Sequence, residues 1–390
     1  MRFRLLLIFL SLLLSLPVFG YDIGRSSTSL LIPQTDGRPP YPITLVGDSA
    51  LASFASTGNG TEDNPYIIAG YNVDSSLGAG FVVKDTTMHF VAKNIIVMGD
   101  GLHQGFLLQN VTNGVVEHSS AVGSSFGFVF SSCSNIILRN NNATQNAIYG
   151  YHLSNTTGFV VEDNIAVDNL EGFVVEQSQN NHLENNSASG QNTGFYLLRS
   201  DRNTLTLNTA SGNKLGYLLS SAHNNSVLEN KANKNSGYAG LALSSSHYNL
   251  VDKNQVESNT ENGIYLAVSN QNTLTLNSVQ SNGKDGIVLE DSVGCDLRKN
   301  TATGNTGAGF SLINASYNTF SENNAVGNSD AFQVDSSSLS NAFTSNSPAM
   351  NTVDSSSSVS KVGAGSVGGF PLVVGCVALV GVFAVRKKRW

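Results

Sequence analysis

Apolar side chains recur along most of this 390-residue chain at fixed distances from a small residue. When the small residue is counted as place zero, apolar residues stand at places one, three, eleven and sixteen. The small residues lie 22 to 24 positions apart, and they are Gly105, Gly127, Gly150, Gly172, Gly194, Gly216, Gly240, Gly263, Gly286, Gly309 and Ala331. A period of this length indicates a repeat architecture, in which each unit buries its apolar face against the next unit.

The spacing within one repeat predicts three short strands. Places one and three hold pairs such as Phe195 and Leu197, and alternation with a period of two is typical of a strand with one buried face. Places eleven and sixteen hold one apolar residue each, such as Leu205 and Ala210, which predicts two further short strands. Three strands joined by bends describe one coil of a triangular solenoid.

Asparagine fills the predicted bends in regular columns at places nine, fourteen and nineteen. Asparagine tolerates the left-handed backbone of a sharp bend, so we expect that conformation to fall on these residues. Asparagine side chains stacked ~4.8 Å apart can also hydrogen-bond from coil to coil. We therefore interpret the column at place fourteen as a structural ladder rather than a ligand-binding row. This ladder comprises Asn164, Asn186, Asn208, Asn230, Asn254, Asn277, Asn300 and Asn323.

The short motifs of the repeat resemble those of a known family. The coils follow a Gly-aromatic-x-Leu pattern and an N-x-L-x-x-N pattern, and the phrase NTLTLN occurs both at 203–208 and at 272–277. The stretch TGNGTEDNPYII at 57–68 is similar to the phrase that opens such domains. These motifs resemble the pectin-lyase-like superfamily, and in particular its NosD-like branch of exported prokaryotic proteins.

The resemblance implies an all-β fold, a single-stranded right-handed parallel β-helix with coils of 22 to 23 residues. It covers roughly residues 43–346. It implies no particular activity, because this fold hosts lyases, hydrolases, epimerases, adhesins and accessory proteins.

Both ends of the chain carry apolar segments outside the repeat. Arg2 and Arg4 precede an apolar run at 5–16, which predicts a cleaved secretory signal peptide. The apolar run at 367–385 is long enough for a transmembrane helix, and the basic residues after it predict a cytoplasmic tail. We therefore expect an exported, membrane-anchored protein whose bulk lies on the cell-surface side. The expected organisation is a signal peptide at 1–20, a lead-in at 21–42, the β-helix at 43–346 (cap and first coils at 43–104, regular coils at 105–346), a Ser/Gly-rich stalk at 347–366, the transmembrane helix at 367–385 and a basic tail at 386–390.

The charge of the exported part narrows the range of partners. Without Arg2, Arg4 and the four basic residues of the tail, 15 basic residues remain against 28 acidic ones, a net charge of −13. This excess argues against nucleic acid and anionic lipid head groups as partners. The three cysteines, Cys133, Cys295 and Cys376, do not provide a disulfide framework. No motif indicates a cofactor.

Carboxylates and histidines stack at two places of the repeat. Glu162 and Glu184 occupy place twelve of successive coils, where stacked carboxyl groups could act as an acid–base pair, and they are the catalytic candidates. The alternative that we favour is a solvated surface row, because the carboxylate motifs of polygalacturonase-like and lyase-like enzymes do not occur. His223 and His247 share place seven of adjacent coils, and they are the candidates for a metal site. We predict no metal, because no cysteine or methionine joins them in the repeat.

Place two of the first strand faces outward but is more apolar than a free sheet face should be. It includes Tyr196 and Tyr265, whose rings could stack on sugar rings, and these are the binding candidates. The alternative is ordinary β-propensity, which favours such residues on any strand.

These observations favour a non-catalytic cell-surface protein that presents a rigid face to glycans or surface proteins, in an adhesive or envelope role. The first alternative is a carbohydrate-active enzyme, similar to polysaccharide lyases or hydrolases, that uses Glu162 and Glu184. The second alternative is a NosD-like copper accessory protein. The expected partners are a polysaccharide or a cell-surface protein, and the membrane through the C-terminal helix, but not nucleic acid.

Overall fold

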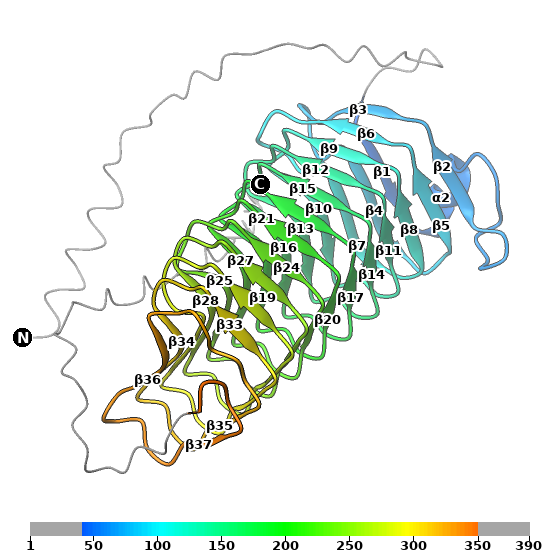
Figure 1. The fold of residues 1–390 in the computed structure, drawn as a ribbon. Helices are drawn as coiled ribbons and strands as arrows, with labels where there is room; N and C mark the ends of the chain where they lie inside the picture. The colour runs from blue at the N-terminus through cyan, green and yellow to red at the C-terminus, as the bar shows by residue number, and fades with distance from the viewer. Residues whose placement is uncertain (1–40, 350–390) are drawn as a thin grey trace, which may run out of the picture. The chain divides into compact units, whose positions relative to one another are not determined.

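The computed structural model describes residues 41–349, which form one right-handed parallel β-helix (Figure 1). The predicted all-β solenoid is therefore confirmed. The repeat pattern does not predict the short helix α2 (Gly47–Phe54), which lies at the N-terminal end and buries Leu51 against the first coils. Within residues 41–349, no helix is both long and apolar enough to cross a bilayer. The predicted signal peptide and transmembrane helix lie outside the described residues.

Three parallel sheets run along the β-helix, and a regular coil contributes one strand to each. We call them sheets A, B and C, with 13, 13 and 11 strands, and strands from consecutive coils are hydrogen-bonded neighbours. Sheet A consists of β1 (Ile43–Val46), β4 (Phe81–Thr86), β7 (Phe106–Val111), β10 (Phe126–Ser131), β13 (Tyr149–Ser154), β16 (Glu171–Glu176), β19 (Thr193–Leu198), β22 (Leu215–Ser220), β25 (Ala239–Ser244), β28 (Asn262–Ala267), β31 (Ile287–Glu290), β34 (Ala308–Ile313) and β36 (Asp330–Val334).

The strands of sheets B and C are shorter, as the single apolar residues at places eleven and sixteen predict. Sheet B consists of β2 (Tyr66–Ala69), β5 (Phe90–Lys93), β8 (Gly114–Glu117), β11 (Ile137–Arg139), β14 (Val160–Glu162), β17 (His182–Glu184), β20 (Thr204–Thr206), β23 (Ser226–Leu228), β26 (Leu250–Asp252), β29 (Thr273–Thr275), β32 (Asp296–Arg298), β35 (Thr319–Ser321) and β37 (Ala342–Thr344). Sheet C consists of β3 (Asn72–Asp74), β6 (Ile96–Met98), β9 (Ser120–Val122), β12 (Asn142–Thr144), β15 (Ile165–Val167), β18 (Ser187–Ser189), β21 (Thr209–Ser211), β24 (Lys231–Asn233), β27 (Gln255–Glu257), β30 (Ser278–Gln280) and β33 (Thr301–Thr303).

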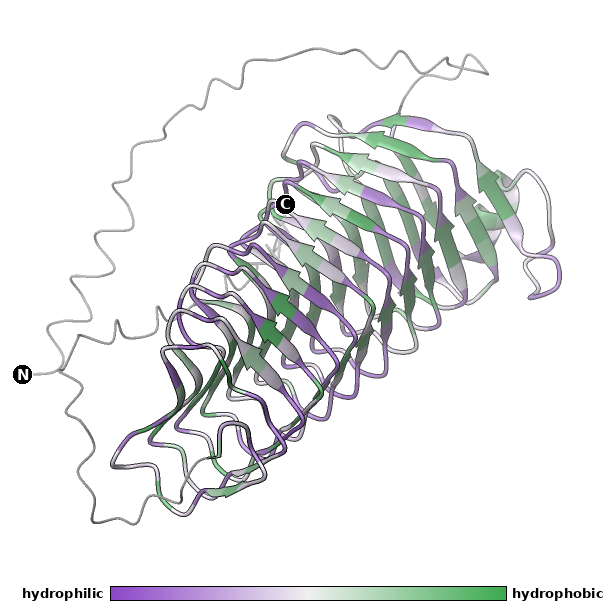
Figure 2. Ribbon diagram, in the orientation of Figure 1, coloured by the Kyte–Doolittle hydropathy of each residue, from purple (hydrophilic) through white to green (hydrophobic). Residues whose placement is uncertain are grey.

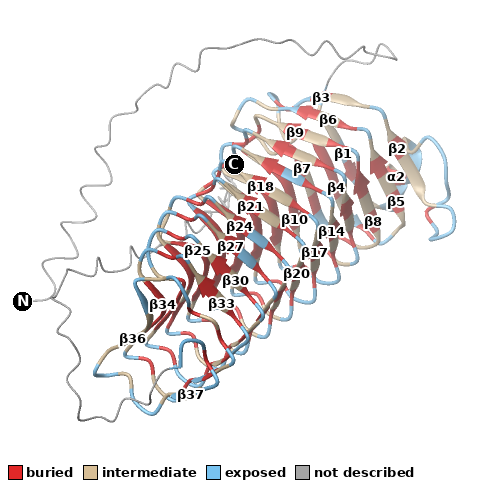
Figure 3. Ribbon diagram, viewed as in Figure 1, coloured by how far each residue is buried: buried red, intermediate tan, exposed pale blue. Residues whose placement is uncertain are grey.

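The inward side chains stack in columns that form one continuous core. Figure 2 shows the apolar residues along the strands, and Figure 3 shows buried positions along the strands and both exposed and buried positions at the bends. In sheet A, successive aromatic rings lie nearly parallel with centroids 4.5 to 5.0 Å apart. These buried rings belong to Phe128, Tyr151, Phe173, Phe195 and Tyr217. Each such aromatic pair contributes about 0.5–1.5 kcal/mol beyond its buried area.

The small residue at place zero is required by the close approach of neighbouring coils. A Cβ atom on Gly172 would lie 2.4 Å from the carbonyl oxygen of Gly194, which is far inside van der Waals contact. Glycine therefore stands at the beginning of the sheet A strands of the regular coils at 105–309, because a side chain there would push two coils apart.

The asparagine column at place fourteen is a continuous hydrogen-bonded ladder. Asn186 Oδ1 accepts hydrogen bonds from the backbone N–H (2.9 Å) and the Nδ2 (3.0 Å) of Asn164 in the preceding coil. Asn164 Nδ2 also donates to the carbonyl oxygen of Leu138 at 2.9 Å. The same bonds recur in coil after coil, for example from Asn208 to Asn230. The amides are buried, so they satisfy backbone groups at bends that water does not reach.

The left-handed backbone conformation falls on the residue before each ladder asparagine rather than on the asparagine itself. Asp163, Asn185, Leu207 and Glu229 have φ angles of 57°, 52°, 58° and 55°. The expectation that the ladder asparagines adopt this conformation is therefore wrong. The ladder requires the asparagine side chain to turn inward, so the sharp bend is made one residue earlier, by whichever residue stands there.

Candidate functional site

The catalytic candidates of the sequence lie on the outer face of sheet B. Glu162 and Glu184 are direct neighbours in the register of β14 and β17. Glu184 lies 3.0 Å from Nε2 of His182, and its side chain is 42% exposed. In the two coils before Glu162, Arg139 and Glu117 form an ion pair at 2.7 Å. The structure thus places both glutamates in a solvent-facing row of charges.

The two stacked histidines have a structural role at their bend. The rings of His223 and His247 are 5.0 Å apart and nearly parallel. Nδ1 of His223 accepts the backbone N–H of His247 at 3.1 Å, and Nδ1 of His247 accepts that of Asn270 at 2.9 Å. Burial, reinforced by the neighbouring His223, lowers the pKa of His247. The imidazoles therefore act as hydrogen-bond acceptors in a ladder like that of asparagine.

Tyr196 and Tyr265 both lie on the outer face of sheet A, as predicted, but their rings are less accessible than sugar stacking requires. Tyr196 is only 9% exposed and packs in a second apolar cluster with Val174, Leu218 and Ala242. Tyr265 is half-buried beside that cluster, and its hydroxyl donates to Glu290. The outer face of sheet A is therefore a packed surface around Tyr196.

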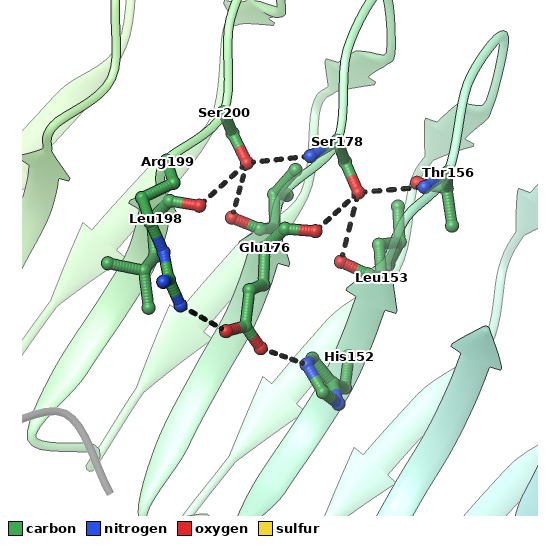
Figure 4. Close-up of polar contacts among 9 residues, drawn as sticks. His152, Leu153, Thr156, Glu176, Ser178, Leu198, Arg199 and Ser200 are labelled. Atoms are coloured by element: carbon green, nitrogen blue, oxygen red, sulfur yellow. Dashed lines mark hydrogen bonds and ion pairs between the residues drawn. The ribbon is translucent and has the colours of Figure 1, made fainter. Parts of the chain in front are cut away.

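A polar cluster on β13, β16 and β19 adjoins this apolar cluster (Figure 4). Glu176 stands at its centre, because Oε2 lies 3.3 Å from Nε2 of His152 and Oε1 lies 3.0 Å from Nη2 of Arg199. The hydrogen bond from His152, together with Arg199, holds the pKa of Glu176 below its ordinary value. Glu176 is therefore an ionised carboxylate that orients the ring of His152 through Nε2. Nδ1 of His152 is the ring nitrogen that Glu176 does not contact.

The bends after the strands fix where Glu176 and Arg199 point. Ser178 Oγ donates to the carbonyl oxygen of Glu176 at 2.7 Å, and Ser200 Oγ donates to that of Leu198 at 3.0 Å. The backbone N–H of Ser178 in turn donates to Ser200 Oγ at 3.0 Å, which joins the two bends. Arg199 has a φ angle of 49° at its bend, and its guanidinium lies against Glu176 one coil away.

The most unusual titratable group of this face is Glu171, the first residue of β16. Its carboxyl group is hydrogen-bonded to Thr193 in the next coil, and Lys214 lies near enough to act on its charge. Its Oε2 atom is buried without a hydrogen-bond partner among the described residues. Burial nevertheless dominates and raises the pKa of Glu171 from 4.5 to about 7. Glu171 is thus close to half-ionised at neutral pH.

Tyrosines surround the two glutamates. Tyr149 is the register neighbour of Glu171, and its ring packs against His152 with centroids 4.8 Å apart. Burial raises the pKa of Tyr196, and the charges of Glu171 and Glu176 add to the effect of burial. Burial also raises the pKa of Tyr238 to about 12, with a contribution from Tyr196. This set combines a proton-exchanging carboxyl group, neutral phenols and a carboxylate-bound imidazole, which are components of general acid–base catalysis.

Sequence reasoning missed these residues because it looked for chemistry within one column. Glu171 and Glu176 stand at the two ends of the same strand, in the stretch EGFVVE, while His152 and Arg199 come from the coils on either side. The sequence does contain a signal for Glu171. The residue before the glycine is Tyr149 in the preceding coil, whereas in this coil it is the acidic Glu171.

Glu171 predicts a pH-dependent stability. Its folded-state pKa of about 7 exceeds the ordinary value of 4.5, so the unfolded chain loses this proton first as the pH rises. The contribution of Glu171 to the free energy of unfolding is therefore fully present below pH 4.5. It is lost as the pH rises to 7, by about 3 kcal/mol in total. Urea unfolding of wild type and Glu171→Gln from about pH 4 to pH 8 checks this. The same pH dependence in both proteins would contradict the assignment.

Two family models match the sequence, and both agree with this architecture. One is described as "Right handed beta helix region" and matches residues 185–326. The other is described as "Periplasmic copper-binding protein (NosD)" and matches residues 55–236. The chain is a parallel β-helix repeat protein. No curated protein sequence matches this β-helix protein.

Solved structures share the fold of this β-helix protein at low sequence identity. A point mutant of the periplasmic alginate epimerase AlgG is 16% identical, with a TM-score of 0.55 over 77% of this chain and 89% of that chain. AlgG itself is 16% identical, with a TM-score of 0.52 over 77% and 88% of the two chains. DFA-IIIase from Arthrobacter chlorophenolicus A6 is 10% identical, with a TM-score of 0.50 over 73% and 91%. These similarities show the fold.

The described residues of this β-helix protein do not fit the copper site that the second model's description implies. Residues 41–349 bring together no group of three or more His, Cys, Asp or Glu side chains that could hold a metal ion. His223 and His247 have already engaged their Nδ1 atoms. Burial raises the pKa of Cys133 and that of Cys295 to about 11, which disfavours the thiolate form that binds metals.

Proposed function

We propose that this protein is an exported carbohydrate-active enzyme that carries out acid–base chemistry on a polysaccharide bound along the outer face of sheet A. The observation that carries the proposal is the carboxyl group of Glu171, with a buried oxygen that has no partner among the described residues and a pKa raised to about 7. Perturbed groups of this kind gather at catalytic sites, and a catalytic acid or base works best when its pKa lies near the working pH.

The neighbouring groups have distinct roles in this proposal. Glu171 is the proton-exchanging group, and its buried Oε2 atom has no hydrogen-bond partner among the described residues. Glu176 is held as a carboxylate by His152 and Arg199, so it acts as a positioning residue. It presents His152 in one orientation, which makes that imidazole the second candidate for proton transfer. Tyr196 has a raised pKa and remains a neutral hydrogen-bond donor at neutral pH.

The shape of the face supports a polymeric carbohydrate as substrate. The coils repeat every ~4.8 Å, so the five steps from β13 to β28 span roughly 24 Å. Over this length the face combines tyrosines with an apolar middle section formed by Leu218 and Ala242. Because Leu218 and Ala242 are buried, sugar units are bound in this proposal through the polar side chains that border the apolar section, among them Glu176 and Arg199. The carbohydrate enzymes among the fold neighbours add support.

This proposal takes up the enzymatic alternative of the sequence analysis in place of the non-catalytic surface protein. It moves the chemistry from Glu162 and Glu184, which face solvent on sheet B, to Glu171 on sheet A. Export is supported by the predicted signal peptide and by the word periplasmic in the descriptions of NosD and AlgG. Membrane anchoring by residues 367–385 stays a sequence prediction, since they lie outside the described residues.

The test is a turnover screen of the purified protein on a panel of neutral and acidic polysaccharides. Product release is followed by reducing-end assay, by absorbance of unsaturated ends and by proton NMR, so that hydrolysis, elimination and epimerisation are each detected. We expect conversion of at least one polysaccharide. Saturable binding of a glycan with no conversion by any of the three readouts would contradict the enzyme and favour the non-catalytic glycan-binding protein.

A further inference from the structure

The guanidinium group of the candidate site is already matched by a carboxylate. Arg199 Nη2 lies 3.0 Å from Glu176, and the same carboxylate also accepts a contact from His152. The charge of Lys214 lowers the pKa of Glu171, but burial has the stronger, opposite effect. A carboxylate on a bound sugar would therefore meet a guanidinium group that already pairs with a protein anion.

Further along the same face, the acidic groups outnumber the basic ones. Asp285 precedes β31 and Glu290 ends it, and burial raises the pKa of each. Lys284, the basic neighbour of Asp285, is paired with Glu261 at 3.0 Å. Residues 41–349 as a whole contain 12 basic and 25 acidic residues, a net charge of −13. Carboxyl groups with raised pKa values donate and accept hydrogen bonds with hydroxyl groups, but they repel anions once they ionise.

We infer that the polysaccharide bound on sheet A is neutral and is recognised through its hydroxyl groups, rather than a polymer of uronic acids. This inference rests on the proposed function, because it names the substrate class of the same site. A uronate unit beside Glu171 would add a like charge next to a poorly solvated carboxyl group. It would raise the pKa of Glu171 further, so the ionised form of Glu171 would be costly beside a bound uronate.

Binding of matched oligosaccharides tests the inference directly. The probes are a neutral hexasaccharide panel (glucan, mannan, xylan and galactan) and the hexamers of galacturonate and mannuronate, titrated by calorimetry at 20 mM and 300 mM salt. We expect at least one neutral hexasaccharide to bind at least tenfold more tightly than either uronate, with little dependence on salt. The uronates should bind more tightly at high salt, because salt screens the repulsion.

A single substitution should create uronate binding. Glu176→Gln removes the carboxylate that neutralises Arg199 and leaves an unmatched guanidinium, which favours a bidentate contact with a sugar carboxylate. We expect the affinity for a uronate hexamer to rise about tenfold in this variant. The matched control is Glu290→Gln, which makes the same charge change on the same face but uncovers no cation, since Glu290 accepts from the Tyr265 hydroxyl. Its uronate affinity should change less than threefold.

The outcomes separate this inference from the proposed function. Conversion of uronate polymers with no binding of the neutral panel would overturn the inference and leave the enzyme standing. Binding of a neutral hexasaccharide without conversion of any polymer would support the inference and remove the enzyme. An equal gain of uronate affinity in Glu176→Gln and Glu290→Gln would also overturn it, because overall charge and not the released Arg199 would then be the cause.

Discussion

Replacing Glu171 with glutamine is expected to reduce turnover of the polysaccharide substrate by about 10²–10⁴-fold, the range that general acid–base catalysis supplies. Glutamine keeps the shape of the side chain and can still bond to Thr193. It cannot exchange a proton, however, so the loss should appear in kcat, while the binding of oligosaccharides changes little. In the wild type, the pH dependence of kcat/KM should show an apparent pKa near 7, the value to which burial raises that of Glu171.

Two variants make this expectation specific. Glu184→Gln carries the same substitution on the outer face of sheet B, beside His182, and should keep wild-type kcat. Glu171→Asp keeps the titratable group but withdraws it by one methylene, so it should retain more activity than Glu171→Gln at its own optimum pH. A loss smaller than about threefold in Glu171→Gln would exclude this carboxyl group as the proton-transferring residue, and a loss confined to Glu184→Gln would return the chemistry to sheet B.

Replacing Asn208 with alanine is expected to lower the free energy of unfolding by about 2–5 kcal/mol. Asn208 Oδ1 accepts from the backbone N–H and the Nδ2 of Asn186, both at 2.9 Å. Its Nδ2 donates to the carbonyl oxygen of Leu183 at 2.8 Å and to Asn230 at 3.0 Å. The substitution leaves several buried polar groups short of a partner, and each such group costs about 1–3 kcal/mol.

Urea unfolding followed by circular dichroism measures this effect. Asn192→Ala is the control, because Asn192 is half-buried and stands outside the ladder columns. It should change the free energy of unfolding by less than about 0.5 kcal/mol, as surface substitutions usually do. Similar values for the two variants would mean that the ladder amides add little beyond the backbone hydrogen bonds of the coils.

The fold could be predicted from the sequence because its rules act within one repeat. At 203–208, the asparagine columns at places nine and fourteen and the apolar column at place eleven predict a short strand between two bends. The structure has β20 at Thr204–Thr206 between the buried Asn203 and Asn208. Alternation at Phe195 and Leu197 likewise marked a sheet A strand whose two inward side chains are fully buried. The repeat period and the residue types are sufficient to predict such strands and bends, because each coil has the same local structure.

The remaining features depend on contacts between coils, which a single repeat does not reveal. Asparagine propensity suggested where the left-handed residues lie, yet Leu207 adopts that conformation because the adjacent Asn208 must face its ladder partners. Tyr196 alternates outward, which suggested an exposed ring, but it packs with Val174 and Leu218 from the coils on either side. The site was missed for the same reason: His152, Glu176 and Arg199 meet only when three coils are stacked.

The side-chain amides of the asparagine ladder form a net dipole along the axis of the β-helix. In each step the side-chain oxygen faces the preceding coil, as Asn186 Oδ1 faces Asn164 and Asn346 Oδ1 faces Asn323. The amide carbonyl dipoles are therefore aligned along the axis and do not cancel as they do between alternating peptide groups of a strand. Aligned dipoles add, as they do in an α-helix. The N-terminal end of the stack is the negative pole and the C-terminal end is the positive pole, so an otherwise regular array of coils has two electrostatically different ends.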